Sequence, residues 1–491
     1  MKDREKMKGA AGTILWLLVL VLLSAGFLAV FSYNTSPFCK IDIEDSSFFR
    51  LVGMGMTKGR LPYRDFYDMK GIYLFLIEYL AQLIHFGRAG CLFLQALNMA
   101  AVLFLIDKIH MVNEPPIGFF KRFLWLLPYL WVISLTIWGG NLTEEFSLPY
   151  VLICVYLVRR YLKEHNGEDH PPLWGAIYGA CFGIIAFIRV TNAATICAVV
   201  LFILIILIGN KRFKNIFLNG IGFIGGAAVS VLPGILFCAK NGILKDMAEQ
   251  VFAFGFTYAN EGSLFNFHRN PLFFVFLFPL IPALLYRKQT GKYFYFILID
   301  MAALAAYLAL GNGYMHYNTM LIPHMAAGTA IILDVRPEVR REKIKKCVCL
   351  LLLVCTMMSI AGRVYQNYRI FVYTSLTDEM YDYPAIETAS HIPPEEKDSV
   401  YTYGIPSAWY VYTGIFPCIR YCDWQDHYIK LSEDIREDLK RLIEESPPGW
   451  IVTKAGEDAK LPDFMRSALE KNYNRYAEND YYVLWKYSFS V

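Results

Sequence analysis

Residues 14–31, ILWLLVLVLLSAGFLAVF, form an apolar block without a single charged side chain. A helix needs about 20 mostly apolar residues to cross a bilayer. Comparable blocks recur along this 491-residue chain, which is 56% hydrophobic and 18% charged, whereas an ordinary soluble domain carries about 25% charged residues. The composition therefore excludes a single soluble globule, a disordered chain, a secreted disulfide scaffold and a typical nucleic-acid binder. It predicts a multi-pass membrane protein built from α-helices.

We expect about eleven transmembrane helices, arranged as an all-α bundle. The apolar blocks that predict them cover residues 14–31, 90–106, 123–138, 146–158, 173–188, 193–208, 216–238, 271–286, 293–310, 317–333 and 347–360.

Lys and Arg are concentrated in every second gap between these blocks, and cytoplasmic loops are the ones enriched in these residues. The gaps at 139–145 and 311–316 contain neither residue, and the gap at 189–192 contains only Arg189. The alternation predicts a cytoplasmic N-terminus. A crossing at 71–86 would invert every later loop, so we expect this stretch to lie in the membrane interface, or to dip in and return. An ordinary twelfth span is the alternative.

The chain changes character after the last block. Residues 1–363 are expected to form the transmembrane domain. Residues 364–491 are charged and rich in tyrosine, and they are expected to form a small α/β domain outside the cytoplasm. The patterns predict strands at 399–404, 449–453 and 481–487, and helices at 431–445 and 463–472.

The first predicted outer loop, residues 32–70, concentrates charged side chains at its two ends. These are Asp42, Glu44 and Asp45 at one end, and Asp65, Asp68 and Lys70 at the other. Carboxylates held against a membrane lose hydration, which tends to raise their pKa values and suits a general base. An ordinary solvated acidic turn is the simpler alternative.

The second predicted outer loop begins GGNLTEEFSLP, residues 139–149. Glu144 and Glu145 stand before an apolar block, where they could serve function or simply complement the helix dipole, with Thr143 as the cap. Arg189 could extend to the membrane interface or hold a phosphate with its planar fork.

Metal and cofactor signals are weak. A divalent cation at Asp42, Glu44 and Asp45 is the lesser alternative to a metal-free site. His316 lies at the outer end of a later block, where a lone histidine is more often a structural hydrogen bonder. Cys418 and Cys422 could pair, but no paired C-x-x-C spacing is present. No Rossmann or P-loop pattern appears either, so we expect no cofactor and no nucleotide-sugar donor.

The order of these motifs resembles the GT-C-type integral membrane glycosyltransferases, in particular the group with the protein O-mannosyltransferases and lipid A aminoarabinose transferases. The resemblance covers roughly residues 1–335. It rests on Glu44–Asp45, on GRLPYRDFYDMKG at 59–71 and on NLTEEFSLP at 141–149. It implies an enzyme that moves a sugar from a polyprenyl-phosphate donor to an acceptor hydroxyl on the outer face of the membrane.

The resemblance also implies roles for particular residues. Asp45, with Glu44 beside it, would act as the base or orient the acceptor, and Lys70 would contact the donor phosphate. The family order is Asp then Glu, whereas this chain has Glu44 then Asp45, so which of the two is the base stays open. The family's Lys-Pro-Pro is replaced here by Lys70, Gly71 and Ile72.

Further residues complete the predicted site. Arg64 and Arg189 are additional candidates for the donor phosphate. Candidates for substrate binding are Asp65, Asp68, Glu144, Glu145, His316 and Tyr317. We expect the site residues to line one pocket that opens sideways into lipid, where the lipid-linked sugar arrives.

Two other functions are weighed against a transferase. A glycolipid transporter or flippase would explain many spans, but transporters usually carry broken helices and charges near the midplane. A non-catalytic membrane scaffold is the third reading. The expected partners are a polyprenyl-phosphate sugar, membrane lipids and an acceptor, without nucleic acid. The sequence does not identify the sugar, the acceptor, the stereochemical outcome, the role of the C-terminal domain or the oligomeric state.

Overall fold

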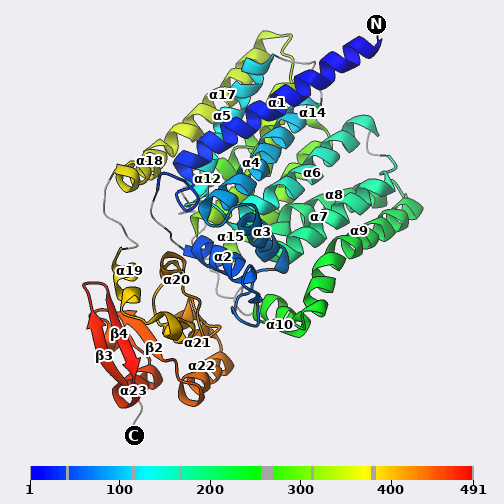
Figure 1. Ribbon diagram of the computed structural model, residues 1–491. Helices are drawn as coiled ribbons and strands as arrows, with labels where there is room; N and C mark the ends of the chain where they lie inside the picture. Colours follow the sequence, from blue (N-terminus) through cyan, green and yellow to red (C-terminus); the bar gives the residue numbers. More distant parts are fainter. Residues whose placement is uncertain are drawn as a thin grey trace. The chain divides into compact units, whose positions relative to one another are not determined.

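The computed structural model describes most of the chain as helices with one small sheet (Figure 1). The described residues are 2–39, 42, 44–112, 118–165, 168–255, 270, 272–310, 314–376 and 383–488. The chain divides into two compact units. Unit 1 comprises Met1–Ser32, Leu92–Phe237 and Ala259–Phe371, and unit 2 comprises Tyr33–Cys91, Cys238–Tyr258 and Val372–Val491.

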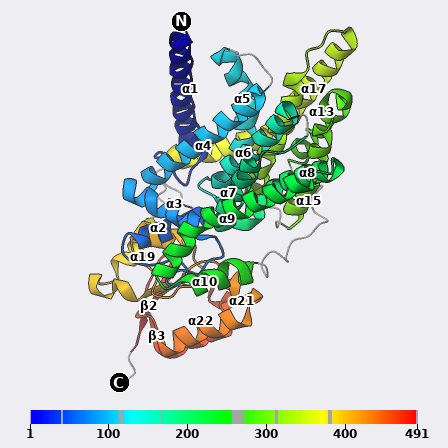
Figure 2. The same cartoon turned by 90° about the vertical axis from the view of Figure 1, so that its right-hand side faces the viewer.

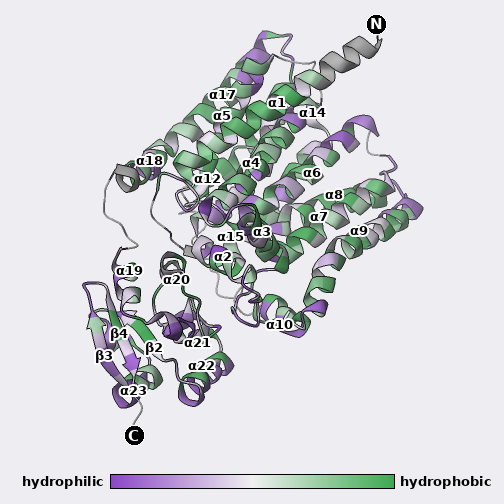
Figure 3. Cartoon of the chain, viewed as in Figure 1, coloured by the Kyte–Doolittle hydropathy of each residue, from purple (hydrophilic) through white to green (hydrophobic). Residues whose placement is uncertain are grey.

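Unit 1 is a bundle of apolar helices around one hydrophobic core. Its helices are α1 (Lys2–Phe31), α4 (Arg88–Met111), α5 (Phe119–Thr136), α6 (Thr143–Glu164), α7 (Pro172–Arg189), α8 (Ala194–Gly209), α9 (Phe213–Lys240), α12 (Phe273–Leu277), α13 (Leu280–Leu285), α14 (Arg287–Thr290), α15 (Tyr293–Leu310), α16 (Leu321–Asp334), α17 (Arg340–Ser359) and α18 (Ala361–Leu376). Short 3₁₀ turns cover Val190–Ala193 and Met315–Met320. Figure 3 shows hydrophobic residues along most of these helices, with hydrophilic residues at many of their ends.

Each predicted span falls on a helix or on two consecutive helical segments. Four helical stretches are long and apolar enough to span a membrane, and the α17–α18 pair, bent by 43°, would add a fifth if it counts as one span. The eleven-span topology therefore stays a prediction. The four stretches are Ala11–Phe31, Arg88–Met111, Pro172–Gly209 and Phe213–Lys240.

The helices α7 and α9 approach each other through glycine. A Cβ at Gly179 would lie 1.9 Å from the carbonyl oxygen of Phe223, and a Cβ at Gly226 would lie 1.9 Å from that of Ala176. Neither position can therefore carry a side chain at this separation. Small residues allow close backbone approach where helices pack in lipid. This contact holds α9, of which only 11% of the apolar window is buried, against the rest of unit 1.

Unit 2 combines helices with a four-stranded sheet of order β1-β2-β4-β3. The β1–β2 pair is parallel, and the β2–β4 and β3–β4 pairs are antiparallel. The elements are α2 (Glu44–Met56), α3 (Ile72–Ile84), α10 (Leu244–Ala248), a π-helical turn (Glu249–Phe254), α19 (Tyr383–Ser390), β1 (Val400–Thr402), α20 (Ala408–Thr413), α21 (Gln425–Leu431), α22 (Glu433–Glu445), β2 (Trp450–Lys454), α23 (Asp463–Asn472), β3 (Tyr473–Glu478) and β4 (Tyr482–Tyr487).

The core of this α/β part lies between the sheet and its helices. Ile435, Leu439 and Ile443 repeat at helical spacing along α22 and pack in one cluster with Ile451 of β2 and Leu469 of α23. Figure 2 shows α22 beside the strands. The predicted strands at 399–404, 449–453 and 481–487 correspond to β1, β2 and β4, and both predicted helices are present. The strand β3 was not predicted.

The first loop folds together with the C-terminal residues. Tyr67 donates its backbone N–H to the carbonyl of Arg420 at 2.9 Å, and Arg60 donates to the carbonyl of Pro417 at 2.7 Å. The compact units therefore differ from the predicted domains, which placed residues 32–70 with the transmembrane helices. A loop between two spans can be assigned to neither part by composition alone, because its packing partners lie more than 300 residues further along.

The stretch expected to lie in the membrane interface forms α3. Its 13 residues reach about 20 Å at 1.5 Å per residue, less than the hydrocarbon thickness of about 30 Å. Glu78 and Gln82 are buried within unit 2, where Gln82 accepts the backbone N–H of Gly87 at 2.7 Å. The length fits a helix that does not cross, and its orientation in the membrane stays a prediction.

Candidate active site

Asp42 is a structural counter-ion rather than a reactive group. Its side chain is 2% exposed and forms ion pairs with Arg50 and Arg88, the latter at 2.7 Å. Arg50 also donates to the carbonyl of Asn34 at 2.9 Å, and Arg88 to that of Cys39. The sequence groups Asp42 with Glu44 and Asp45, but the two arginines compensate its charge within the fold.

Asp45 has a different environment from Asp42. It lies in the first turn of α2, is partly exposed, and makes no hydrogen bond or ion pair with any described residue. The side chain of Glu44 lies outside the described residues, so the choice between the two acids stays a prediction. An acid with no counter-ion keeps its oxygens available to a substrate hydroxyl.

Asp423 lies close enough to Asp45 for their charges to interact, and it was not found from the sequence. Burial raises the pKa of Asp423 to about 7, and the negative charge of Asp45 adds to this increase. Asp423 accepts the backbone N–H of Trp424 at 2.9 Å and that of Ser407 at 3.4 Å. A carboxyl group with a pKa near neutrality is a candidate proton donor or acceptor. No motif marks it, because only the fold brings residue 423 to residue 45.

Two serines connect the segments that carry these acids. The hydroxyl groups of Ser47, on α2, and Ser407, which precedes α20, lie 3.0 Å apart and are both buried. Ser47 is two residues from Asp45, and Ser407 contacts Asp423. The serine pair therefore fixes the two carboxylates relative to each other.

Lys70 is buried beside Asp68. The Lys70 ammonium lies 3.8 Å from Asp68 and 5.5 Å from the ring centroid of Phe49, while Asp68 accepts the Lys70 backbone N–H at 2.7 Å. Asp68 donates its own N–H to Gln250 at 3.1 Å, and Gln250 donates to the carbonyl of Tyr63 at 2.8 Å. These contacts hold the predicted phosphate-binding lysine at a fixed place in unit 2.

Tyr428, on α21, lies near three acidic residues: Asp45, Asp68 and Asp423. Burial raises the pKa of its hydroxyl, and the charges of Asp68, Asp423 and Asp45 each raise it further. Such effects weaken with distance. Asp45, Asp68 and Asp423, here called the acid cluster, therefore gather near Tyr428 although they are far apart in sequence.

Arg64 and Asp65 lie at the surface of unit 2. Arg64 is 54% exposed and pairs with its neighbour Asp65 at 3.0 Å. Asp65 also accepts the backbone N–H of Leu61 at 2.7 Å, as an aspartate does in a turn. The structure gives this pair a turn-forming role, and their predicted roles toward phosphate and substrate stay untested.

Unit 1 contains a second group of predicted residues. Arg189 donates to Glu144 at 2.8 Å and to the Tyr317 hydroxyl at 2.5 Å, and its guanidinium lies 4.3 Å from the Tyr317 ring centroid. His316 packs edge-on against Tyr317, with ring centroids 4.6 Å apart. We call Glu144, Arg189, His316 and Tyr317 the arginine cluster. Arg189 pairs with these protein groups, which favours a role within the fold over simple extension to the membrane interface.

Glu145 has its own partners beside the arginine cluster. It accepts hydrogen bonds from Gln95 at 2.6 Å and from the backbone N–H of Leu142 at 3.1 Å. Leu142 is the N-cap of α6, and Thr143 is already its first helical residue. The prediction that Thr143 caps this helix is therefore wrong, because the Glu145 side chain reaches back to the N-cap backbone instead. Glu145 accepts a backbone N–H at the start of α6 that has no partner within the helix. This supports the alternative that Glu145 stabilises the helix N-terminus.

Among the described residues the histidines and cysteines add no metal site and no disulfide, although Cys422 directly precedes Asp423 in the chain. His324 is fully buried and pairs with Asp300 at 2.7 Å. All eleven cysteines are free, including Cys418 and Cys422. Among the residues that the structure describes, no group of three or more His, Cys, Asp or Glu side chains could hold a metal ion.

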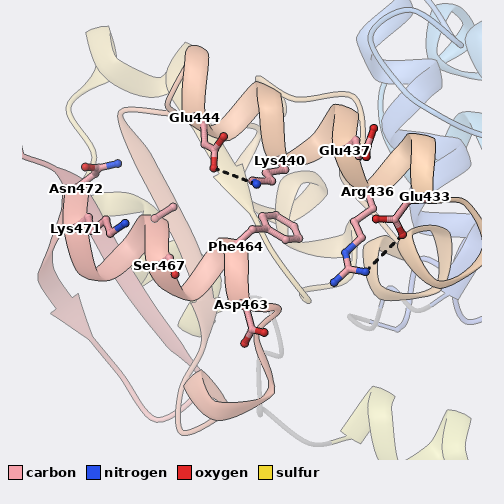
Figure 4. A pocket seen from close by; sticks show the side chains of 11 residues that line it. Glu433, Arg436, Glu437, Lys440, Glu444, Asp463, Phe464, Ser467, Lys471 and Asn472 are labelled. Carbon is pink, nitrogen blue, oxygen red and sulfur yellow. Dashed lines mark hydrogen bonds and ion pairs between the residues drawn. The ribbon is translucent and has the colours of Figure 1, made fainter.

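A polar groove of about 740 Å³ lies between α22 and α23 (Figure 4). None of the predicted site residues lines it. Its charges are largely internal pairs, with Arg436 3.5 Å from Glu433 and Lys440 3.9 Å from Glu444. The groove is therefore an open surface feature of the α/β part rather than the candidate active site.

The fold is that of the GT-C integral membrane glycosyltransferases. The structure is similar to that of ArnT from Cupriavidus metallidurans bound to undecaprenyl phosphate, with 12% sequence identity, a TM-score of 0.61, and coverage of 98% of this chain and 99% of that chain. It is also similar to the Archaeoglobus fulgidus oligosaccharyltransferase in complex with Zn and sulfate, with 11% identity, a TM-score of 0.50, and coverage of 96% and 73%. The predicted fold class is confirmed at this level.

A family assignment follows from the sequence comparison. Residues 15–322 match the family described as "Putative competence-induced protein Ccs4 N-terminal domain". The chain belongs to this family. A search of curated proteins finds no match.

Proposed function

We propose that this membrane protein is a glycosyltransferase that moves a sugar from a polyprenyl-phosphate donor to an acceptor hydroxyl. The fold supports the class, since its structural neighbours are GT-C glycosyltransferases, one of them solved with undecaprenyl phosphate. The observation that carries the proposal is the contrast between Asp42, which two arginines neutralise, and Asp45, which has no counter-ion among the described residues.

In the proposed reaction, the acceptor oxygen attacks the anomeric carbon while its proton passes to Asp45. The bond between the anomeric carbon and the phosphate oxygen breaks, and its electron pair leaves with the polyprenyl phosphate. A lipid phosphate is a sufficiently good leaving group that one cation can stabilise it, without the metal that a nucleotide diphosphate leaving group commonly requires. Asp423, protonated below about pH 7, can donate a hydrogen bond within the same cluster.

Lys70 is the better candidate for the donor phosphate. Its ammonium lies 3.8 Å from Asp68 of the acid cluster, which places a cation in the same neighbourhood as the proposed base. Arg189 is held by Glu144 at 2.8 Å and would have to give up a charge-assisted hydrogen bond. We therefore assign phosphate binding to Lys70, and substrate positioning to Arg189, Glu144 and Tyr317.

The test is transfer by membranes that contain the full-length protein and a series of labelled polyprenyl-phosphate sugars. Asp45→Asn should abolish formation of the glycosidic bond and release of polyprenyl phosphate. The control is Asp434→Asn, which removes an exposed carboxylate of α22 and should leave both unchanged. Full activity of Asp45→Asn would remove Asp45 from the proposed role. Movement of intact lipid-linked sugar without a new bond would identify a transporter instead.

We also propose that the N-terminus is cytoplasmic and that the acid cluster faces the outside. Cysteines introduced at Lys288 and at Glu433 test the sidedness, after replacement of the exposed native cysteines. A membrane-impermeant maleimide added to intact cells should label position 433 and spare position 288. Labelling of position 288 from outside would contradict the proposed topology.

A further inference from the structure

A second polar pocket lies within unit 1, where α6 and α16 end and α15 begins. It has a volume of about 370 Å³, within the usual range for small-molecule sites. Its cations are Arg159 and Lys163, one turn apart on α6, and Arg336, which follows α16. The sequence predicts all three on the cytoplasmic side, whereas the proposed transfer reaction takes place on the outer side.

The enrichment of basic residues in cytoplasmic loops does not by itself explain Arg159. A basic residue that only sets the orientation of the chain in the membrane can keep its side chain in water. The Arg159 side chain, in contrast, is 4% exposed. Burying a guanidinium is costly unless it is paired and hydrogen-bonded. Arg159 donates to Asp334 at 2.6 Å, yet its Nε is buried without a hydrogen-bond partner among the described residues.

The other two cations leave the pocket with an excess of positive charge. Lys163 donates to a backbone carbonyl, that of Val112. Neither Lys163 nor Arg336 forms an ion pair with a described residue. Asp334 is the one acid among the lining residues, and Arg159 already pairs with it. Three cations against one acid favour an anionic ligand.

The remaining lining completes an anion site. Gln289 and Thr290 of α14 and Tyr293 at the start of α15 supply neutral hydrogen-bonding groups, and Leu162 and Ile331 supply apolar wall. A planar guanidinium binds phosphate through two parallel hydrogen bonds, and ammonium groups bind it as point charges. We propose that this pocket binds a phosphate group, carried either by a membrane lipid or by a soluble phosphate compound.

The experiment uses the full-length protein in phospholipid nanodiscs. For a soluble ligand, calorimetry measures binding of inorganic phosphate and glycerol 3-phosphate in phosphatidylcholine discs. For a lipid ligand, native mass spectrometry counts phosphatidic acid retained from discs that contain both lipids. Binding of the soluble probes identifies a soluble ligand, and retention of phosphatidic acid alone identifies a lipid headgroup.

The variant Lys163→Ala/Arg336→Ala removes the two exposed cations of the pocket and leaves the Arg159–Asp334 ion pair intact. Because hydrogen bonds to charged groups are strong, loss of both cations should weaken binding at least about tenfold. The matched control, Arg340→Ala/Lys343→Ala, removes two exposed charges of α17 outside the pocket and should bind as the wild type does. Equal loss in both variants, or no binding of either probe to the wild type, would overturn the proposal.

Discussion

Glu144 accepts a hydrogen bond from Arg189 at 2.8 Å, and its carboxylate is only 1% exposed. The same guanidinium donates to the hydroxyl of Tyr317. Three residues from separate parts of the sequence, at the start of α6, at the end of α7 and in the turn before α16, thus form one buried polar group in unit 1. A buried charge of this kind depends on its partner, because the partner replaces the hydration lost on folding.

The first prediction concerns this ion pair. Glu144→Gln keeps the shape of the side chain but leaves the Arg189 charge uncompensated, and breaking a buried pair costs about 3–5 kcal/mol. We expect a clearly lower melting temperature for the purified protein, measured by intrinsic fluorescence. Glu164→Gln at the other end of α6 removes an exposed carboxylate that pairs with Arg160, and it should change the melting temperature little. Equal melting temperatures would show that the pair contributes no stability.

The second prediction separates the two aspartates of the first loop. Asp42→Asn leaves Arg50 and Arg88 without their shared carboxylate, so it should reduce folded yield and lower the melting temperature. Asp45→Asn removes no ion pair within the described residues and should leave both unchanged while abolishing transfer. Size-exclusion chromatography and thermal melts of both variants measure this difference. A stable Asp42→Asn protein would contradict the structural role assigned to this residue.

The third prediction concerns pH and Asp423. Its pKa in the folded protein is about 7, above the value of about 3.9 expected in the unfolded chain. The folded state therefore holds an extra proton between these values, and the stability from this group is present below about pH 4 and lost as the pH rises to about 7.

Asp423→Asn removes this titration. Between pH 5 and pH 8, the melting temperature of Asp423→Asn should therefore fall less than that of the wild type. The exposed substitution Asp434→Asn should follow the wild type. Identical pH profiles for Asp423→Asn and the wild type would show that Asp423 titrates at its ordinary pKa.

The fourth prediction uses two adjacent glycines of α9. A Cβ at Gly226 would lie 1.9 Å from the carbonyl oxygen of Ala176, whereas a Cβ at Gly225 would meet nothing within 4 Å. Gly226→Ala should therefore separate α7 from α9 and lower the melting temperature. Gly225→Ala should be neutral or slightly stabilising, since alanine favours helix over glycine by about 1 kcal/mol. Equal effects of the two substitutions would contradict the close approach.

The periodicity and hydropathy of the chain predicted most of its secondary structure. Each apolar block forms a helix or a helix pair, because a long apolar run can satisfy its backbone hydrogen bonds internally. The strands β1, β2 and β4 are rich in β-branched and aromatic residues. The strand β3, with sequence YNRYAE, was missed because it is polar and mostly exposed, and only its pairing with β4 makes it a strand.

The candidate site was less predictable, because the residues that interact in it lie far apart along the chain. Asp42, Glu44 and Asp45 look equivalent in sequence, and only the fold brings Arg50 and Arg88 to Asp42. Asp423 carries no motif and gains its raised pKa through burial beside Asp45. The pairing of Arg189 with Glu144 likewise joins the end of α7 to the start of α6, two positions in separate gaps between the apolar blocks. The prediction that residues of both units line one lateral pocket remains to be tested.

Unit 2 draws on three stretches of chain that are synthesised far apart in time. When residues 33–91 leave the ribosome, the segment from Val372 onward that completes their folded unit does not yet exist. Ser47, Arg60 and Tyr67 can form their contacts only after residues 407, 417 and 420 have been synthesised. A nascent or truncated chain must therefore carry an unfinished loop through membrane insertion, which makes it a natural target for quality-control proteases until translation ends.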